Sequence, residues 1–279
     1  ISMQAPATET IALDQHKNPV RTETDTLLFR PGGHGALLWN LQQCGGDIVL
    51  ISNIDNVVPD HLKPPILGWR TLLGGCLATL QERIAALLDA LAQAQDQEST
   101  LRECETFIQR ELHDPLPSFY SQWTTQGKRA FFQGHFNRPI RVCGMVQNTG
   151  DPGGGPFWVE DKAGTVSKQI VEQAQIDVNS PAQQELFQKS THFNPVDMVC
   201  GLKNVHGEPF DLQHYIDPDT AFVAQKSYRG TPIHVLEWPG LWNGGMANWL
   251  TVFVEIPRSA FNPVKTYLDW LHPNHQPPS

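Results

Sequence analysis

The chain has 279 residues, a net charge of −9 and an isoelectric point near 5.6. This acidic balance excludes a bulk electrostatic attraction to nucleic acid or to an anionic membrane surface. No apolar run approaches the roughly 18 residues of a membrane span, and the length is enough to bury a core in one large domain or two small ones.

The cysteines and the first residues bear on the compartment. The five cysteines are odd in number, scattered and never spaced as C-x-x-C, which favours a reducing, cytoplasmic location without a disulfide framework or zinc site. The opening ISMQAPATET has neither a basic region nor an apolar stretch, so we expect no secretory signal. The sequence does not begin with methionine, which we interpret as processing, truncation or the continuation of a longer protein.

The first predicted elements are a strand, a glycine turn, a helix and a second strand. Residues 24–29 (TDTLLF) have strand character, and 36–44 (ALLWNLQQC) have helical spacing, with Gly45 as a typical C-terminal stop. Residues 47–54 (DIVLISNI) form a near-continuous apolar run, which is typical of a strand covered on both faces of a parallel sheet. This order predicts a βαβ-like unit.

Two amphipathic helices are predicted next, over about residues 66–115. Apolar residues recur there at steps of three or four, which indicates a packing stripe along each helix. We therefore expect a helical hairpin inserted between elements of the sheet. The tail 272–279 is expected to be loose.

Strand-type segments dominate the second half of the chain, separated by turns rich in proline and glycine. We predict strands at 138–146, 156–161, 197–204, 233–238 and 249–257.

The glycine turn at residues 32–35 is the first candidate for chemistry. Glycines at the start of a helix let a ligand approach the backbone, where free N–H groups favour an anion or a polar base edge. Tight turns also need glycine for steric reasons alone, so both explanations stay open for Gly33 and Gly35. His34, inside the turn, either contacts a ligand or makes an ordinary hydrogen bond.

The second candidate is the end of the apolar strand, where Asp55 and Asn56 follow at once. In open α/β sheets, ligands bind beyond the carboxyl ends of the strands. A carboxylate there can hold Mg²⁺, which prefers one or two carboxylates together with phosphate oxygens. The alternative is an Asx turn that needs no ligand. Taken together with the glycine turn, the position favours a ligand site.

These motifs resemble those of a known group of enzymes. RPGGHGALLWNL (30–41) and ISNIDN (51–56) are similar to the Pro-x-Gly-(His/Asn)-Gly loop and the (Ile/Val)-Asp-Asn strand end of UTP-dependent sugar-1-phosphate uridylyltransferases, the UDP-sugar pyrophosphorylases. Later segments resemble theirs in the same order, at 141–176, 191–199 and 261–271. Over nearly its whole length, the chain is identified as a member of a bacterial family, domain-of-unknown-function family 4301, itself similar to these transferases.

The resemblance implies an α/β fold of the nucleotide-diphospho-sugar transferase type (GT-A or Rossmann-like), with a mixed sheet and helices on both faces. It also implies a single domain over 1–279, the C-terminal portion of a longer protein. The related transferases begin with a glycine-rich loop whose basic residue grips the nucleotide triphosphate. No such loop precedes residue 30, so we expect the N-terminal half of the nucleotide-binding sheet to be missing.

The implied reaction is attack of a sugar-1-phosphate on the α-phosphate of a nucleoside triphosphate, taken as UTP, which yields an NDP-sugar and pyrophosphate. Positioning and neutralisation of charge dominate such chemistry. By the resemblance, Asp55 would hold Mg²⁺. Lys265, in the segment FNPVK, would place an ammonium against a phosphate.

The resemblance also assigns contacts with the nucleotide or the sugar to Gly33, His34, Gly35, Asn56, Glu172 and His192. Glu172 is otherwise a charge on a strand face, and His192 a hydrogen-bonded core residue. Gln173 and Gln175 stand where the transferases have tyrosine and glutamate, so the sugar preference can differ.

Two other functions stay open. One is a non-catalytic module that binds a sugar nucleotide or sugar phosphate, which the missing nucleotide loop favours. The other is a metal hydrolase using His34, His192 and Asp55, which no H-x-H or H-E-x-x-H spacing supports. The sugar, the base and the oligomeric state are left open by the sequence.

Overall fold

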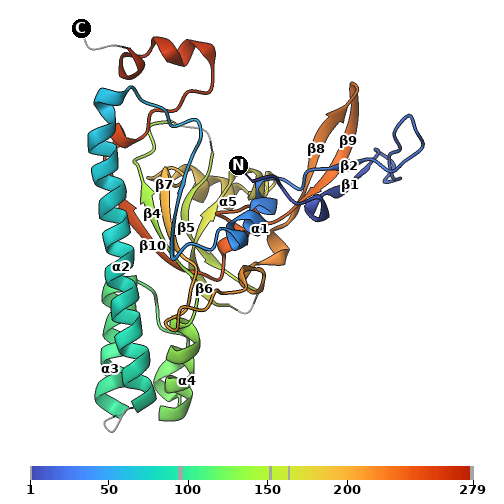
Figure 1. Ribbon diagram of the computed structural model, residues 1–279. Coiled ribbons are helices and arrows are strands. Elements are labelled where there is room, and N and C mark those ends of the chain that lie inside the picture. Colours follow the sequence, from blue (N-terminus) through green and yellow to red (C-terminus); the bar gives the residue numbers. More distant parts are fainter. Residues whose placement is uncertain (1, 94–96, 151–152, 163, 277–279) are drawn as a thin grey trace. The chain divides into compact units, whose positions relative to one another are not determined.

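The computed structural model describes residues 2–93, 97–150, 153–162 and 164–276, and Figure 1 shows their elements. The chain divides into two compact units. The first unit comprises Ile1–Gly45 and Asp211–Asn248, and the second comprises Gly46–Phe210 and Trp249–Ser279. Two compact units do not by themselves make two domains, so the single domain stays a prediction.

The strands are β1 (Thr10–Leu13), β2 (Phe29–Arg30), β3 (Ile48–Ser52), β4 (Ile140–Met145), β5 (Gly155–Glu160), β6 (Val166–Val171), β7 (Asp197–Gly201), β8 (Phe222–Tyr228), β9 (Thr231–Glu237) and β10 (Leu250–Glu255). The helices are α1 (Leu37–Gln43), α2 (Lys63–Gln93), α3 (Gln97–Phe107), α4 (Thr125–Phe136) and α5 (Pro181–Gln188). The strands predicted in the second half of the chain are confirmed.

The first unit contains an antiparallel sheet of order β2-β1-β9-β8. Its β8–β9 hairpin turns at Arg229 and Gly230, whose φ angles of 51° and 81° suit the two-residue turns that follow the twist of a hairpin. Ala12, Ile233 and Val235 pack together on one face of this sheet.

The predicted helix is confirmed as α1. Gly45, which follows its end, has the left-handed φ of 65° that is typical of a helix stop. The predicted βαβ-like unit is wrong. Strand β2, at the end of the predicted strand, pairs antiparallel with β1 through Ile11 and Phe29, whereas β3 belongs to another sheet. The strand before the helix forms its hydrogen bonds with a segment just upstream, as Ala12 N–H to Leu28 O also shows, so no parallel pair arises.

The second unit is built on a mixed sheet of order β10-β4-β7-β3, which confirms the mixed sheet. Strands β10 and β4 are parallel, and β7 is antiparallel to both β4 and β3. Strands β3, β4 and β10 therefore point the same way. Their carboxyl ends and the amino end of β7 meet at one edge, which we name the carboxyl edge.

Strand β3 differs from its prediction as a strand covered on both faces. It is the last strand of the sheet, with β7 as its partner. Ile48 and Leu50 keep 46% and 45% of their surface exposed. A short apolar run has the same pattern in an edge strand as in a central one, so the sequence could not separate them.

Helix α2 packs on β4 and β7 through the apolar stripe seen in the sequence. Its buried residues are Ile66, Leu73, Leu77, Leu80, Ile84, Leu87 and Leu91. Helix α3 returns beside it and ends in a π-helical turn, Ile108–Leu112, closed by His113 in the left-handed region. The helical hairpin predicted at 66–115 is confirmed (Figure 1).

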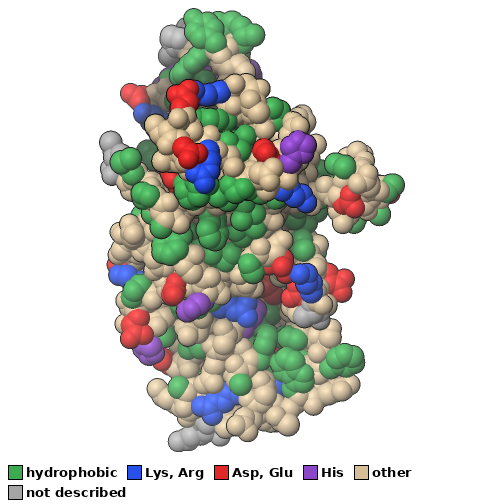
Figure 2. Space-filling view, turned by 90° about the vertical axis from the view of Figure 1, so that its right-hand side faces the viewer, with side chains coloured by type: hydrophobic (Ala, Val, Ile, Leu, Met, Phe, Trp, Pro, Cys, Tyr) green, Lys and Arg blue, Asp and Glu red, His purple; other side chains and the backbone are tan. Residues whose placement is uncertain are grey.

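Although α2 has 31 residues, no helix in the described part of the chain combines the length and apolarity needed to cross a bilayer. Figure 2 shows basic and acidic side chains interspersed on the face it presents. In the tail, Pro273–His275 form a short turn, and Asn274 Nδ2 donates to Asn262 Oδ1 at 2.7 Å. Residues 277–279 of the predicted loose tail lie outside the described residues.

Candidate functional site

Loops gather at the carboxyl edge of the second unit's sheet. They comprise residues 53–57 after β3, 146–148 after β4, 190–196 before β7 and 256–265 after β10. Backbone hydrogen bonds tie them in pairs: Phe193 N–H donates to Val146 O at 2.9 Å, and Val264 N–H donates to Asp55 O at 2.8 Å. The edge thus carries a framework of mutually bonded loops.

Asp55 and Lys265 lie in two loops that this framework joins. The backbone N–H of Val264 donates to the Asp55 carbonyl, and Lys265 is the residue that follows Val264. Asn56 and Pro263 form a bridge beside them. Asp55 is half-buried and Lys265 is exposed, with its Nζ 5.9 Å from the centroid of the Phe193 ring. Within the described residues, neither charged group has an ion-pair or hydrogen-bond partner, so both are available to a ligand.

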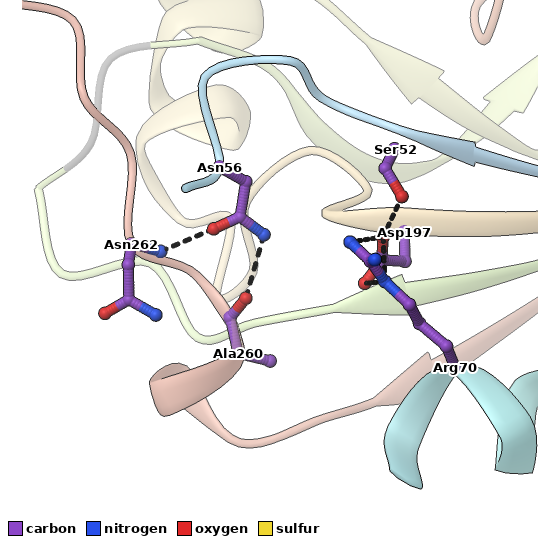
Figure 3. Close-up of polar contacts among 6 residues, drawn as sticks. All are labelled: Ser52, Asn56, Arg70, Asp197, Ala260 and Asn262. Carbon is purple, nitrogen blue, oxygen red and sulfur yellow. Dashed lines mark hydrogen bonds and ion pairs between the residues drawn. The ribbon is translucent and has the colours of Figure 1, made fainter. Parts of the chain in front are cut away.

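Asn56 holds the loop that carries Lys265 (Figure 3). Its Nδ2 donates to Ala260 O at 2.9 Å, and its Oδ1 accepts from Asn262 N–H at 2.8 Å. The amide is therefore engaged with the backbone of that loop, and within the described residues one of its N–H hydrogens is left for a ligand. The contact with a sugar hydroxyl stays a prediction.

Asp197 anchors the same edge and was missed by the sequence analysis (Figure 3). Its carboxylate is 1% exposed, accepts from Ser52 Oγ, and is 3.1 Å from Arg70 Nε through both oxygens and 3.0 Å from Arg70 Nη2. This pair joins α2 to the ends of β7 and β3. The sequence feature that could have revealed this pair is Arg70, which lies within the apolar stripe of α2, since a buried cation needs a partner.

Glu172 forms local contacts rather than standing as an isolated charge. It caps the short turn Gln173–Gln175: its side chain accepts from the Gln175 backbone, and Gln175 Oε1 accepts from Glu172 N–H at 2.8 Å. Asn194 Nδ2 donates to Glu172 Oε1 at 2.8 Å. The glutamine at 175, which departs from the transferase pattern, thus completes a capping box. The sugar contact of Glu172 stays a prediction.

His192 lies half-buried at the carboxyl edge between two polar side chains. Its Nδ1 is 2.8 Å from Thr191 Oγ1, and its Nε2 is 3.1 Å from Glu255 Oε2. Gln147 Nε2 donates to the other Glu255 oxygen at 3.3 Å. The imidazole is hydrogen-bonded, as one of the two interpretations holds, and its contact with a ligand stays a prediction. Neither Thr191 nor Glu255 was singled out from the sequence.

The glycine turn belongs to the first unit. Gly33 has a φ of 77°, and a Cβ at Gly35 would lie 2.1 Å from Pro239 O. His34 Nδ1 accepts from Leu241 N–H at 3.0 Å, and its ring stacks on Trp242 with centroids 4.6 Å apart. Close packing thus accounts for both the glycines and the histidine, and the predicted base or sugar contacts of Gly33, His34 and Gly35 stay predictions.

Only one way of binding Mg²⁺ fits the described residues of this site. The described part of the chain contains no group of three or more His, Cys, Asp or Glu side chains that could hold a metal ion. Asp55 is a single carboxylate with no ion-pair or hydrogen-bond partner among the residues that the structure describes, which suits a Mg²⁺ ion whose other ligands are phosphate oxygens and water. Among the described residues, His192 and Asp55 of the second unit belong to no such group.

A family model with the description "Domain of unknown function (DUF4301)" matches residues 1–276. The chain belongs to the DUF4301 family. This confirms the family membership expected from the sequence. Among curated proteins, none matches the DUF4301 chain.

Solved structures similar to the DUF4301 chain include UDP-glucose pyrophosphorylases. A point mutant of the Leishmania major enzyme in complex with UDP-glucose is 16% identical, with a TM-score of 0.45 and coverage of 94% of this chain and 46% of that one. UDP-glucose phosphorylase from Trypanosoma brucei is 15% identical, with a TM-score of 0.41 and coverage of 94% and 45%. The DUF4301 chain therefore spans a little under half the length of these proteins.

Proposed function

We propose that this DUF4301 protein is a Mg²⁺-dependent nucleotidyltransferase that joins UTP and a sugar-1-phosphate into a UDP-sugar with release of pyrophosphate. The observation that carries the proposal is the hydrogen bond from Val264 N–H to Asp55 O, at 2.8 Å. It joins the two loops that carry the Asp55 carboxylate and the Lys265 ammonium, neither of which has an ion-pair partner among the described residues, at the edge where α/β sheets bind ligands. The order of the sequence motifs around both residues supports the same reaction.

The chain's own residues would supply binding and orientation. Lys265 would place a point charge against a phosphate, and Asn56 would fix the loop that carries it through its two backbone hydrogen bonds. Asp55 would hold the metal, which when bound neutralises charge on phosphate oxygens. Holding the two reactants in the reacting geometry in this way lowers the barrier of the reaction between them.

The second candidate function is a module that binds a sugar nucleotide or sugar phosphate without turnover. Such a module binds its ligand through the same two charged residues, Asp55 and Lys265, but does not catalyse a reaction. The packing of the glycine turn favours it, since Gly35 lies against Pro239 and His34 against Leu241 and Trp242. Those groups are then structural and do not grip a nucleotide.

The test measures pyrophosphate release from UTP and glucose 1-phosphate with Mg²⁺, together with Mg²⁺-dependent binding of UDP-glucose by calorimetry. Asp55→Asn and Lys265→Ala should each lower the rate by at least about tenfold, the effect of ~1.4 kcal/mol in the barrier. The matched controls are Asp60→Asn and Lys63→Ala, which alter an exposed ion pair of 2.5 Å at the start of α2. Both controls should behave as the unaltered protein.

The outcomes separate the two functions. Release that each site variant slows by at least about tenfold supports the transferase, and Mg²⁺-dependent binding without release supports the binding module. Neither release nor binding across nucleotides and sugar phosphates would sink both.

A further inference from the structure

Thr191, His192 and Glu255 form a continuous hydrogen-bonded chain at the carboxyl edge. Thr191 Oγ1 lies 2.8 Å from His192 Nδ1, and His192 Nε2 lies 3.1 Å from Glu255 Oε2. Thr191 is exposed and the Glu255 side chain keeps 59% of its surface, whereas the His192 side chain between them keeps only 22%. A solute can therefore reach the hydroxyl at one end of this chain and the carboxylate at the other, while the imidazole between them is shielded.

The direction of the hydrogen bonds follows from the groups themselves. A carboxylate only accepts, so His192 Nε2 carries a hydrogen and donates it to Glu255. In the neutral ring, Nδ1 then presents a lone pair, and the Thr191 hydroxyl donates to it. A hydroxyl whose proton points at an imidazole, itself oriented by a carboxylate, has the arrangement that activates a nucleophile.

The surrounding backbone holds the three residues in place. The segment of Thr191 to Phe193 pairs with the loop after β4, with Asn148 N–H to Thr191 O at 3.0 Å and Phe193 N–H to Val146 O at 2.9 Å. Gln147, in the same loop, donates to Glu255 Oε1 at 3.3 Å. Because both ends are fixed, the relay is pre-organised, as reactive groups require.

We propose that Thr191 is a nucleophilic hydroxyl that reacts at phosphorus, in phosphoric esters or anhydrides. As Thr191 Oγ1 bonds to phosphorus, its proton passes to His192 Nδ1, and the bond from phosphorus to the leaving group breaks. Glu255 is a positioning residue, which fixes the tautomer of His192 and stabilises the imidazolium that forms. A cation suits a phosphoryl group, and the Lys265 ammonium lies 5.9 Å from the ring of Phe193, two residues beyond Thr191.

This activity goes beyond the proposed function. A sugar-1-phosphate is already an anion and needs no base to attack, so the relay has no task in that reaction. Its task is the removal of a proton from a hydroxyl. The test below needs no nucleotide, so its result does not depend on whether the transferase reaction occurs.

The experiment treats the whole chain with a fluorophosphonate probe and follows the intact mass, and peptide mapping then locates the adduct. The bond formed is Oγ1–P and the bond broken is P–F, with fluoride leaving and the proton held by His192. We expect one adduct, on Thr191. Thr191→Val should abolish it, and Thr191→Ser should retain it.

Glu255→Gln keeps the shape and a hydrogen-bond acceptor but removes the charge. We expect it to slow labelling by about 10²-fold, because His192, the general base, loses the charge that fixes its tautomer and stabilises its imidazolium. The melting temperature should be unchanged, which a merely structural role would not give. Thr106→Val is the matched control, because the Thr106 hydroxyl donates to a helix carbonyl and touches no imidazole. No adduct, an adduct that persists in Thr191→Val, or labelling of Glu255→Gln at the unaltered rate would overturn the proposal.

Discussion

His135, near the end of α4, is a largely buried ionisable residue of the second unit, with 14% of its side-chain surface exposed. Its ring lies 5.2 Å from that of Phe131 and 5.9 Å from that of Phe136. Burial, and then the positive charges of Arg138 and Lys168, lower the pKa of His135 to about 3. Although His135 Nε2 is 4.0 Å from Asp114 Oδ2, the neutral ring makes no ion pair there.

This shift predicts how stability depends on pH. The pKa of His135 is about 3 in the folded chain against an ordinary value of 6.5. Between these values the unfolded chain binds a proton that the folded chain rejects, so stability falls as the pH falls from about 6.5 toward 3. The slope from this residue approaches about 1.4 kcal/mol per pH unit at most.

The measurement is the free energy of unfolding of His135→Gln and of the unaltered chain between pH 7 and pH 4. The unaltered chain should lose more stability on acidification, because the variant has no imidazole to protonate. His206→Gln, in an exposed turn, is the control and should follow the unaltered chain. Parallel curves for His135→Gln and the unaltered chain would contradict the burial of a neutral ring.

The candidate site shows which residue roles the sequence could supply. Asp55 and Lys265 were found because each lies in a short motif, ISNIDN and FNPVK, that resembles those of the transferases. The hydrogen bonds of Asn56 to 260–262 could not be found, since they join residues about 200 positions apart. Glu255 was missed for the same reason, because it meets His192 only once β10 and the loop before β7 are folded together. Thr191 was missed because its role depends on that contact.

At the scale of elements, the Arg70–Asp197 pair joins α2 to the sheet. Removing one partner of a buried pair leaves the other charge without compensation, at a cost of about 3–5 kcal/mol. Arg70 keeps 26% of its side-chain surface exposed, so we expect Arg70→Met to lower the free energy of unfolding by the lower end, about 3 kcal/mol. Denaturant unfolding measures this directly.

Arg83→Met provides the matched control on the same helix. Arg83 forms exposed pairs with Glu103 and Glu111, both at 3.7 Å, and such pairs contribute about 1 kcal/mol or less. The double variant Arg70→Met/Asp197→Asn should recover part of the loss, since it removes the uncompensated charge. Equal effects of Arg70→Met and Arg83→Met would show that the buried pair contributes nothing beyond a surface contact.

Helices α2 and α3 were predictable because their apolar stripes repeat over successive turns, whereas α4 and α5 were not predicted. Strand partners were not, because pairing is decided by distant segments. The residues before α1 have strand character whichever segment they pair with, and in the structure they pair with β1. The sequence of β3 is as apolar as that of a central strand. Only the sheet order shows that β3 lies at the edge, with β7 as its strand partner.

At the scale of the molecule, the second unit carries the proposed chemistry. Its mixed sheet sets three carboxyl ends and one amino end at a common edge, and the loops there hold Asp55, Asn56, His192 and Lys265. The glycine turn belongs to the first unit, where packing occupies it. The family and the sheet type were predictable from ordered motifs, whereas the division into two units was not, because it arises from contacts between residues 1–45 and 211–248.

The central claim is that Asp55 and Lys265 act on one ligand. A double-mutant cycle with Asp55→Asn, Lys265→Ala and the combined variant, measured as calorimetric affinity for UDP-glucose with Mg²⁺, tests it most directly. We predict that each single change weakens binding by at least about tenfold, and that the combined loss differs from the sum by more than about 0.5 kcal/mol, because the two groups contact the same phosphates. Unchanged affinity in either single variant, or losses that simply add, would contradict the account.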